Sequence, residues 1–270
     1  MSFSVLMSVY CDDNPVHFNA ALESITFSQT KAPGEIILVV DGPIGDELKH
    51  VIKNFDYDLN VVWLKKNVGL GNALSQGLEY CQYNLVARMD SDDISVPERF
   101  ELQLNKFNGD PDLDVLGGQI IEFSGEVNNV LGRRIVPLSN EMIRKRSVYR
   151  NPMNHMSVMF RRDKVLSVGG YKDMFYYEDY YLWLRLIAKN SKFENLDVPL
   201  IFARAGNDLL SRRKGLKNAV NELNFYKRIA YEGLLNPLIS IPLGLIRSFL
   251  RLLPGFVFLK LYSNFLRQKN

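Results

Sequence analysis

The chain has 270 residues, a hydrophobic fraction of 47% and a charged fraction of 23%, as expected for a globular protein with one large or two small domains. Its net charge of +3 is too small to indicate a nucleic-acid-binding protein. The two cysteines, Cys11 and Cys81, form no CxxC pair or disulfide framework. Because the chain also begins without a signal-peptide pattern, we expect it to fold in a reducing cytoplasm.

Strands and helices are expected to alternate through the first half of the chain. Four apolar runs predict buried strands: residues 3–10, 35–41, 60–65 and 84–89. Helices are predicted between and after them: residues 15–29, 44–55, 70–81 and a helix that begins at Pro97. This alternation indicates βαβ units and an α/β fold, with a mainly parallel sheet flanked by helices, because parallel strands are buried on both faces.

The second half of the chain is less regular. It contains apolar runs at residues 113–123, a polar and basic stretch at 128–150, a predicted strand at 156–160 and a predicted helix at 178–189. The stretch at 128–150 predicts a loop with a short helix. The sequence shows no internal repeat and no low-complexity tract.

The tetrad Asp90-Ser91-Asp92-Asp93 directly follows the fourth predicted strand. Three carboxylates this close together repel one another, and a cation that neutralises them is the usual reason for such a cluster to persist. Asp-x-Asp at the end of a strand therefore predicts a site of oxygen ligands for Mg²⁺ or Mn²⁺, whose usual partner is a diphosphate. The alternative is an acidic turn that caps the next helix, because aspartate is a good N-cap residue.

Four polar features fall at the carboxyl ends of predicted strands, where open parallel sheets bind their ligands. They are residues 8–10, Asp41, the glycine-containing stretch 67–71 and the acidic tetrad. Because they come from separate segments, their convergence is more informative than any one of them. The glycine stretch alone is equally typical of an ordinary turn.

These residues, in this order, resemble the family 2 glycosyltransferases of the GT-A fold, in particular bacterial enzymes that build O-antigen, capsule or exopolysaccharide. The matching segments are residues 4–10, 39–42, 67–71, 88–93 with 97–99, and 169–171 with 178–179. The resemblance covers about residues 3–205 and implies a catalytic domain at 1–232, with a nucleotide-binding half at 1–123 and an acceptor-side half at 124–232. The Gln-x-x-Arg-Trp motif of processive members does not occur, which implies addition of a single sugar.

The resemblance assigns roles to the residues around the tetrad. Asp92 is expected to bind the metal ion directly, and Asp90 to hold the ribose or a metal-bound water. Asp93 is expected to contact the sugar or to cap the next helix. Arg88 would pair with the acidic cluster, where it lowers the cost of three close carboxylates, or would bind a phosphate.

Four further residues are expected to bind the nucleotide. Asp41 would accept a hydrogen bond from the base or the ribose, and Asn67 and Gly69 belong to the same binding edge. Tyr10 would stack on the base. The alternatives are a turn-forming aspartate before Gly42 and a tyrosine that only packs.

Asp179 is the expected general base. If the segment that begins at Glu178 is helical, Asp179 shares an inward apolar face with Trp183, whereas Glu178 points toward Tyr181 and Arg185. Burial raises the pKa of an inward carboxyl, and the helix N-terminus opposes this by favouring the anion. The alternative is an acidic N-cap.

Two basic features remain as candidates. His155 falls where the resemblance implies a loop near the diphosphate or the acceptor, and the alternative is a loop histidine bonded to backbone. Arg212 and Arg213 are expected to close over the diphosphate, because guanidinium groups match phosphate oxygens. The alternative for these arginines is a solvated helix face.

Residues 233–270 are rich in Leu, Ile and Phe and contain no Asp or Glu. The longest uncharged stretch, residues 233–246, is shorter than the ~20 residues that a membrane-spanning helix needs. The segment is basic at Arg247, Arg251, Lys260, Arg267 and Lys269. It therefore predicts a helical segment that lies on an anionic membrane surface, at the cytoplasmic face of the bacterial inner membrane. The alternative is a helix packed on the catalytic domain or against a second copy.

The sequence thus predicts an inverting, metal-dependent transferase with a Mn²⁺ or Mg²⁺ cofactor. It would move one hexose, galactose in preference to glucose or N-acetylglucosamine, from a UDP-sugar to a lipid-linked saccharide at a membrane surface, without nucleic acid as a partner. One alternative is a nucleotidyltransferase, which would need a glycine-rich basic signature where residues 11–14 are acidic. The other is a non-catalytic nucleotide-sugar-binding or scaffold protein, against which the retention of Asp41, Asp90, Asp92 and Asp179 argues.

Overall fold

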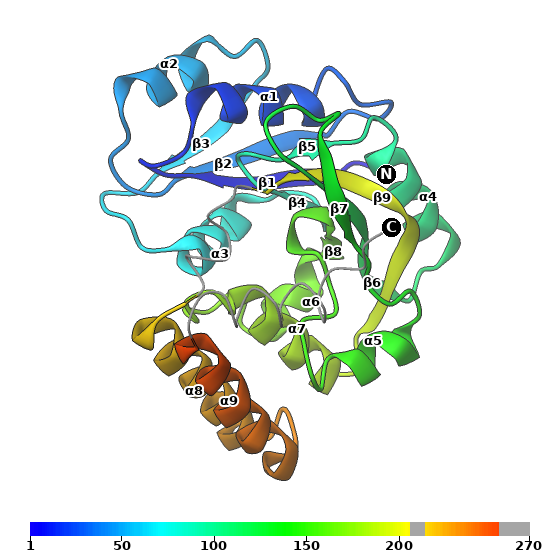
Figure 1. The fold of residues 1–270 in the computed structure, drawn as a ribbon. Coiled ribbons are helices and arrows are strands. Elements are labelled where there is room, and N and C mark those ends of the chain that lie inside the picture. The colour runs from blue at the N-terminus through cyan, green and yellow to red at the C-terminus, as the bar shows by residue number, and fades with distance from the viewer. Residues whose placement is uncertain (206–213, 254–270) are drawn as a thin grey trace.

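The computed structural model describes residues 1–205 and 214–253 (Figure 1). Its first half contains β1 (Ser4–Val9), α1 (Pro15–Ile25), β2 (Glu35–Val40), α2 (Asp46–Asn54), β3 (Asn60–Trp63), α3 (Leu70–Tyr80), β4 (Leu85–Met89), β5 (Ile94–Ser95), α4 (Arg99–Gly109) and β6 (Leu113–Phe123). The second half contains β7 (Val130–Arg134), α5 (Asn140–Arg146), the 3₁₀ turn η1 (His155–Ser157), β8 (Met159–Arg161), α6 (Arg162–Ser167), α7 (Glu178–Ala188), β9 (Lys192–Arg204), α8 (Leu216–Tyr231) and α9 (Pro237–Leu252).

A single sheet runs through the molecule in the order β3-β2-β1-β4-β8-β6-β9-β5, with β7 paired to β6. Strands β3, β2, β1 and β4 are mutually parallel. Strand β8 runs antiparallel to β4 and β6, and β6 and β9 pair in parallel. The apolar runs of β2 and β4 are buried at every position, as expected for parallel strands covered on both faces. The predicted α/β fold is confirmed.

Helices cover both faces of the sheet (Figure 1). Helices α1, α2 and α4 pack on one face, through residues such as Phe18, Leu48 and Phe100. Helices α3, α6 and α7 pack on the other, where Leu74 and Trp183 are fully buried. Successive β-strand residues point to opposite faces, so each strand of the parallel half contributes to both layers. The core thereby fixes the carboxyl ends of β1, β2 and β4 beside one another.

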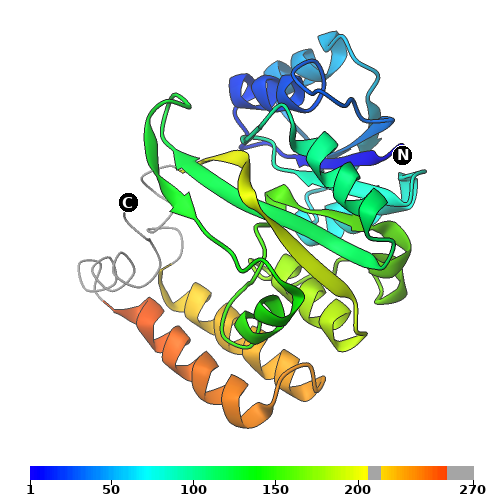
Figure 2. The same ribbon diagram turned by 90° about the vertical axis from the view of Figure 1, so that its right-hand side faces the viewer.

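Helices α8 and α9 form a hairpin at one end of the molecule (Figures 1 and 2). The hairpin packs on α7, where the rings of Tyr177 and Phe225 stack with centroids 4.5 Å apart. Two basic residues expected to face a membrane, Arg247 and Arg251, instead bind the carboxylate of Glu222 on α8. Within residues 1–205 and 214–253, no helix is both long enough and apolar enough to cross a membrane.

Four details differ from the sequence-based expectation. Helix α1 ends at Ile25 rather than near residue 29, and the Thr26 hydroxyl donates to the Leu22 carbonyl (2.7 Å) at its end. Helix α4 begins at Arg99, two residues after Pro97. The strand expected at residues 156–160 begins only at Met159, because η1 precedes it.

The fourth difference is β7, which occupies part of the stretch expected to be a loop. Its ladder pairs Ile120 with Arg134 and Ile121 with Arg133. Val130 and Leu131 are exposed, so the strand lacks the buried apolar pattern that identifies a strand from sequence. Strand β7 is held by backbone pairing with the long neighbouring strand β6. Such pairing leaves no pattern in the sequence of β7 itself.

Candidate active site

The carboxyl ends of β1, β2 and β4 lie side by side, because β1 pairs in parallel with both of its neighbours. The residues that follow these strands are Tyr10, Asp41 and Asp90. They therefore share one edge of the sheet, as the sequence predicted. The side chain of Tyr10 is 38% exposed, which leaves its ring accessible at this edge.

Asp41 ties the end of β2 to the loop before α3. Its carboxylate accepts hydrogen bonds from the backbone N–H groups of Val68 (2.7 Å) and Gly69 (3.0 Å). The side-chain amide of Asn67 donates to the Asp41 carbonyl (3.3 Å). The structure therefore brings Asp41, Asn67 and Gly69 together as predicted. It also gives Asp41 the turn-forming role that was the alternative, since each carboxylate oxygen has two acceptor sites and one on each is already used.

Four carboxylates gather at the end of β4. Burial raises the pKa of Asp92 to about 6, and the charge of Asp90 adds to the effect. Burial also raises the pKa of Asp13, in the loop after β1, to about 6, with Asp92 and Asp90 contributing. The pKa of Asp93 lies well above its usual range for the same reasons. The site therefore holds more negative charge than its surroundings neutralise.

Arg88 pairs with Asp90 and is almost fully buried. Of the two roles that the sequence left open for Arg88, pairing with the acidic cluster or binding a phosphate, the structure shows the pairing. Its Nε and Nη1 atoms are buried without a hydrogen-bond partner among the described residues. Asp93 is also buried, and its Oδ1 accepts from the backbone N–H of Arg204 (2.8 Å). Asp93 thus anchors the end of β9, and the prediction that it caps the next helix is wrong, because the N-cap of α4 is Glu98.

The donor set at this edge fits a hard cation. Within the described parts of the chain, no three Asp, Glu, His or Cys side chains converge to hold a metal ion by themselves. Asp92 is only partly buried and carries a raised pKa, so a cation would relieve its repulsion with Asp90. Carboxylate oxygens suit Mg²⁺ and Mn²⁺, which commonly keep water and substrate phosphates among their ligands. Asp92, with Asp90 beside it, is therefore suited to an ion that a diphosphate also ligates.

Asp179 stands at the start of α7, a helix predicted from the sequence and confirmed. Its Oδ2 accepts a hydrogen bond from the Asn151 side-chain amide (2.5 Å), and its Oδ1 accepts from the backbone N–H of Tyr180 (2.6 Å). Burial raises the pKa of Asp179, whereas these two donors lower it. The carboxylate is thus half-buried, held in one orientation and supported as the anion.

Glu178 packs against the start of α3. Its Cβ lies 3.0 Å from the position that a Cβ on Gly71 would occupy, at the start of α3. Arg185 donates to the backbone carbonyls of Val168 and Gly170. Burial and the charge of Asp179 raise the pKa of Glu178 to about 7. Glu178 is therefore a second carboxyl group at the site, and helix periodicity alone missed it.

Tyr171 connects the two acidic groups. Burial raises the pKa of its hydroxyl, and the charges of Arg88, Asp179, Glu178 and Asp90 all act on it. Such interactions fade over roughly a Debye length, about 8–10 Å in ordinary salt, although burial extends them. The acidic cluster of β4 and the carboxylates of α7 therefore both act electrostatically on Tyr171.

His155 is buried next to Tyr171. Its side chain is buried, and its Nε2 is 2.9 Å from the Tyr171 hydroxyl. The imidazole ring also packs edge-on against Trp183. Burial lowers the pKa of His155 well below its usual range, and the charge of Arg88 acts in the same direction. The histidine is therefore neutral, and its side-chain partner is a tyrosine hydroxyl rather than the backbone expected of a loop histidine.

Asp13, Asn151 and Tyr171 were given no role from the sequence, although Tyr171 belongs to a segment that carries the family resemblance. Asn151 and Tyr171 have partners distant in the chain, Asp179 and His155. The predicted residues Arg212 and Arg213 lie outside the described residues.

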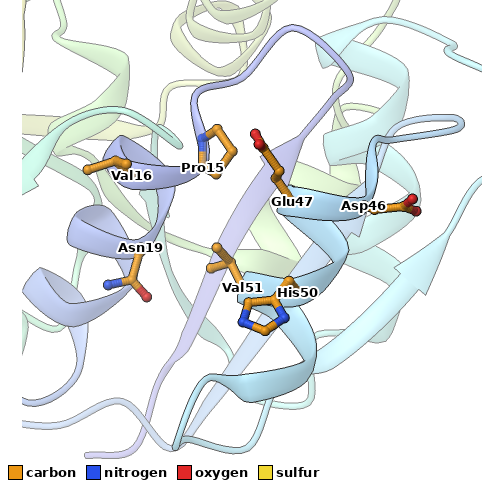
Figure 3. A pocket seen from close by; sticks show the side chains of 7 residues that line it. All are labelled: Pro15, Val16, Asn19, Asp46, Glu47, His50 and Val51. Atoms are coloured by element: carbon orange, nitrogen blue, oxygen red, sulfur yellow. The ribbon is translucent and has the colours of Figure 1, made fainter.

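A hollow of about 600 Å³ opens between α1 and α2 (Figure 3). Its lining residues come from both helices: Pro15, Val16, Asn19, Asp46, Glu47, His50 and Val51. None of the predicted site residues lines it. The predicted catalytic and metal-binding carboxylates lie at the sheet edge. We therefore place the active site there and not in this hollow.

Comparison with known proteins finds similarity over nearly the whole chain. The family described as Glycosyl transferase family 2 matches residues 15–170. The amylovoran biosynthesis glycosyltransferase AmsE of Erwinia amylovora is 40% identical over 266 residues, which cover 97% of this chain and 98% of that protein. The UDP-Gal:alpha-D-GlcNAc-diphosphoundecaprenol beta-1,3-galactosyltransferase of Escherichia coli is 36% identical over 276 residues, which cover 98% of each protein.

The fold is also found among solved structures. The crystal structure of S. aureus TarS 1-349 in complex with UDP-GlcNAc superposes with a TM-score of 0.64 at 17% sequence identity, and the match covers 98% of this chain and 74% of that chain. At this level of identity the likeness concerns the fold alone. It confirms the GT-A architecture that the sequence predicted.

Proposed function

The chain belongs to glycosyltransferase family 2, and we propose that it transfers one hexose, with inversion, from a UDP-sugar to a saccharide carried on a polyprenyl diphosphate. Membership of this family makes the protein a transferase enzyme. Family membership therefore argues against both alternatives raised by the sequence, a nucleotidyltransferase and a non-catalytic binding protein.

The observation that carries the proposal concerns two sets of carboxylates, the acidic cluster at the end of β4 and the pair at the start of α7. Both sets act electrostatically on the hydroxyl of Tyr171. The acidic cluster with Asp92 follows the parallel half of the sheet, where nucleotides bind in open α/β folds. Asp179 approaches from α7, in the second half of the chain. A donor bound at the cluster would then have its sugar between Asp92 and Asp179, and the acceptor would approach from the Asp179 side.

In the proposed reaction, Asp179 accepts the proton of an acceptor hydroxyl. The oxygen then forms a bond to the anomeric carbon, on the face opposite the diphosphate. The bond between that carbon and the diphosphate oxygen breaks, and UDP leaves with the electron pair. We prefer Asp179 to Glu178 for this role because the Asn151 amide and the Tyr180 N–H hold its carboxylate in one orientation.

On the donor side, Asp41 and Asn67 would bind the nucleoside, and Asp92 with Asp90 would hold Mn²⁺ or Mg²⁺. When bound, such an ion neutralises the negative charge on the departing diphosphate. Arg88 pairs with Asp90 and would hold its carboxylate in place as an acceptor for a ribose hydroxyl or a metal-bound water.

The choice of substrates draws on the relatives. The Escherichia coli protein is named for transfer of galactose from UDP-Gal to a GlcNAc-diphosphoundecaprenol acceptor, and the Erwinia protein for amylovoran biosynthesis. We therefore propose galactose ahead of glucose or N-acetylglucosamine, and a role in the synthesis of a surface polysaccharide.

The test is a transfer assay with the full chain, a panel of UDP-, GDP- and dTDP-hexoses, and N-acetylglucosamine linked through diphosphate to a lipid. Each donor is offered with Mn²⁺ and with EDTA. We expect turnover of a UDP-hexose, foremost UDP-galactose, that depends on the metal. Preferential turnover of a GDP- or dTDP-sugar would refute the donor assignment, and full activity in EDTA would refute the metal site.

A further inference from the structure

Helix α9 has an inverted polarity. Its buried positions are Ser240, Gly244 and Ser248, which recur every four residues and so lie on one face. Its exposed positions are large and apolar: Leu238, Ile239, Leu245, Ile246, Phe249 and Leu252, each between 40% and 84% exposed. A helix on the surface of a water-soluble protein has the opposite arrangement, with its apolar face toward the core.

The buried face of α9 is built for close contact with α8. A Cβ on Gly244 would lie only 2.5 Å from the Cβ of Tyr226, so the two helices approach at a residue without a side chain. Small residues in such a contact are typical of helix pairs that pack in lipid, where apolar side chains need not be hidden.

The positive charges of α9 also turn inward. Arg247 Nε donates to Glu222 (2.5 Å), and Arg251 binds the other oxygen of the same carboxylate. Arg251 donates further to the Tyr177 hydroxyl (2.8 Å). The Glu222 side chain is only 1% exposed, so the ion pairs are internal to the hairpin. The outward surface of α9 is consequently left almost wholly apolar.

We propose that the exposed apolar face of α9, formed by Leu238, Leu245, Ile246, Phe249 and Leu252, docks this enzyme onto an anionic lipid bilayer. The helix would lie in the surface of the bilayer with these side chains among the acyl chains.

Charge favours a bilayer over a second copy of the chain as the occupant. The sequence that follows α9, residues 254–270, is apolar and carries Lys260, Arg267 and Lys269 without any acid. Basic residues next to an apolar helix face complement anionic headgroups. A second copy offers, in its own residues 233–270, the same basic charge and no acid to pair with it.

The proposal goes beyond the transfer reaction, because vesicle binding is measured without donor or acceptor. Full-length protein is sedimented with vesicles of phosphatidylcholine and phosphatidylglycerol, and with vesicles of phosphatidylcholine alone. We expect binding to the anionic vesicles, and a loss of at least about tenfold in partition for Leu245→Ser/Phe249→Ser, since each buried apolar side chain contributes about that factor.

The matched control is Tyr80→Ser/Leu102→Ser, which removes exposed apolar side chains on α3 and α4 (57% and 39% exposed) and should bind vesicles as the wild type does. Circular dichroism and UDP binding establish that each variant is folded. Leu238→Ser, at the most exposed position of the face, serves if the double variant unfolds.

Wild-type protein that stays in the supernatant would overturn the proposal, as would a folded α9 variant that sediments like the wild type. Light scattering distinguishes the remaining case: a dimer that dissociates in the α9 variant, with no vesicle binding by either protein, would assign the face to a contact between copies and would also overturn it.

Discussion

At the residue scale, the carboxylates at the end of β4 are the basis for our proposal that this site binds a cation. Arg88 compensates Asp90 through a direct ion pair, whereas Asp13 and Asp92 both retain a pKa of about 6. Asp92 and Asp13 are therefore ionised only at a free-energy cost in the metal-free protein. A bound cation would remove this cost. The free energy released would add to the affinity for the ion and for the diphosphate that it ligates.

We predict that the metal-free protein becomes less stable as pH rises from about 5 to about 7. A carboxyl whose pKa is higher in the folded than in the unfolded chain holds its proton more tightly when folded, so this stabilisation is lost as pH rises through about 6. Asp92→Asn should raise the free energy of unfolding at neutral pH by about 1 kcal/mol, because a shift of one pKa unit corresponds to about 1.4 kcal/mol and partial exposure screens part of the effect.

Urea unfolding in EDTA at the two pH values measures this change. Asp46→Asn is the control, since the side chain of Asp46 is 98% exposed on α2, and it should leave the difference between the two pH values unaltered. An Asp92→Asn protein that is less stable than the wild type at neutral pH would contradict the electrostatic account of the cluster.

The tetrad and Asp41 could be identified from the sequence because each follows an apolar run that predicts a buried strand. Asn151 could not, since its contact with Asp179 joins residues separated by a strand, a helix and a loop. The neighbour of Glu178 in the fold could not be predicted either. The first turn of α7 contacts α3 at Gly71, and a helical wheel contains no information about that neighbour.

At the element scale, the turn after β2 positions the sheet edge at which we propose that the nucleotide binds. Gly42 has a φ of +90°, and a Cβ placed there would be 2.5 Å from the backbone nitrogen of Asn67. The chain therefore requires glycine at this point for two reasons, the left-handed conformation and the close approach of the loop that Asp41 holds.

We predict that Gly42→Ala lowers the free energy of unfolding by about 2 kcal/mol or more, from backbone strain together with the clash. It should also weaken UDP binding, because Asp41 and Asn67 must move apart. Gly45→Ala is the matched control, since Gly45 has a negative φ and open space around its Cβ position. Thermal unfolding and titration with UDP measure both effects, and equal behaviour of the two variants would show that the turn does not position the site.

The parallel strands were predictable because burial on both faces leaves continuous apolar runs, as in β2 and β4. Strand β7 was not, because it pairs only along one edge of β6 and exposes its apolar residues. Helix α9 shows a third case. Its composition indicated a basic, apolar helix, but only the contact with Glu222 reveals that its arginines face inward and its apolar residues face outward.

At the scale of the whole molecule, the two halves of the chain contribute different parts of the proposed active site. The parallel half supplies the edge with Asp41 and the acidic cluster, and the second half supplies Asp179 on α7. The α8–α9 hairpin packs directly on α7, so a bilayer that holds α9 would lie on the same side of the fold as the helix that carries the proposed base. This arrangement suits an acceptor that is itself anchored in lipid.

The central claim is that Asp179 and the acidic cluster form one glycosyl-transfer site, and Asp179→Asn tests it most directly. The substitution keeps the size of the side chain and removes the base. We predict that kcat for sugar transfer falls by about 10²–10⁴-fold, that the affinity for UDP with Mn²⁺ stays close to that of the wild type, and that Glu178→Gln on the same helical turn loses far less activity. Undiminished transfer by Asp179→Asn would contradict the account.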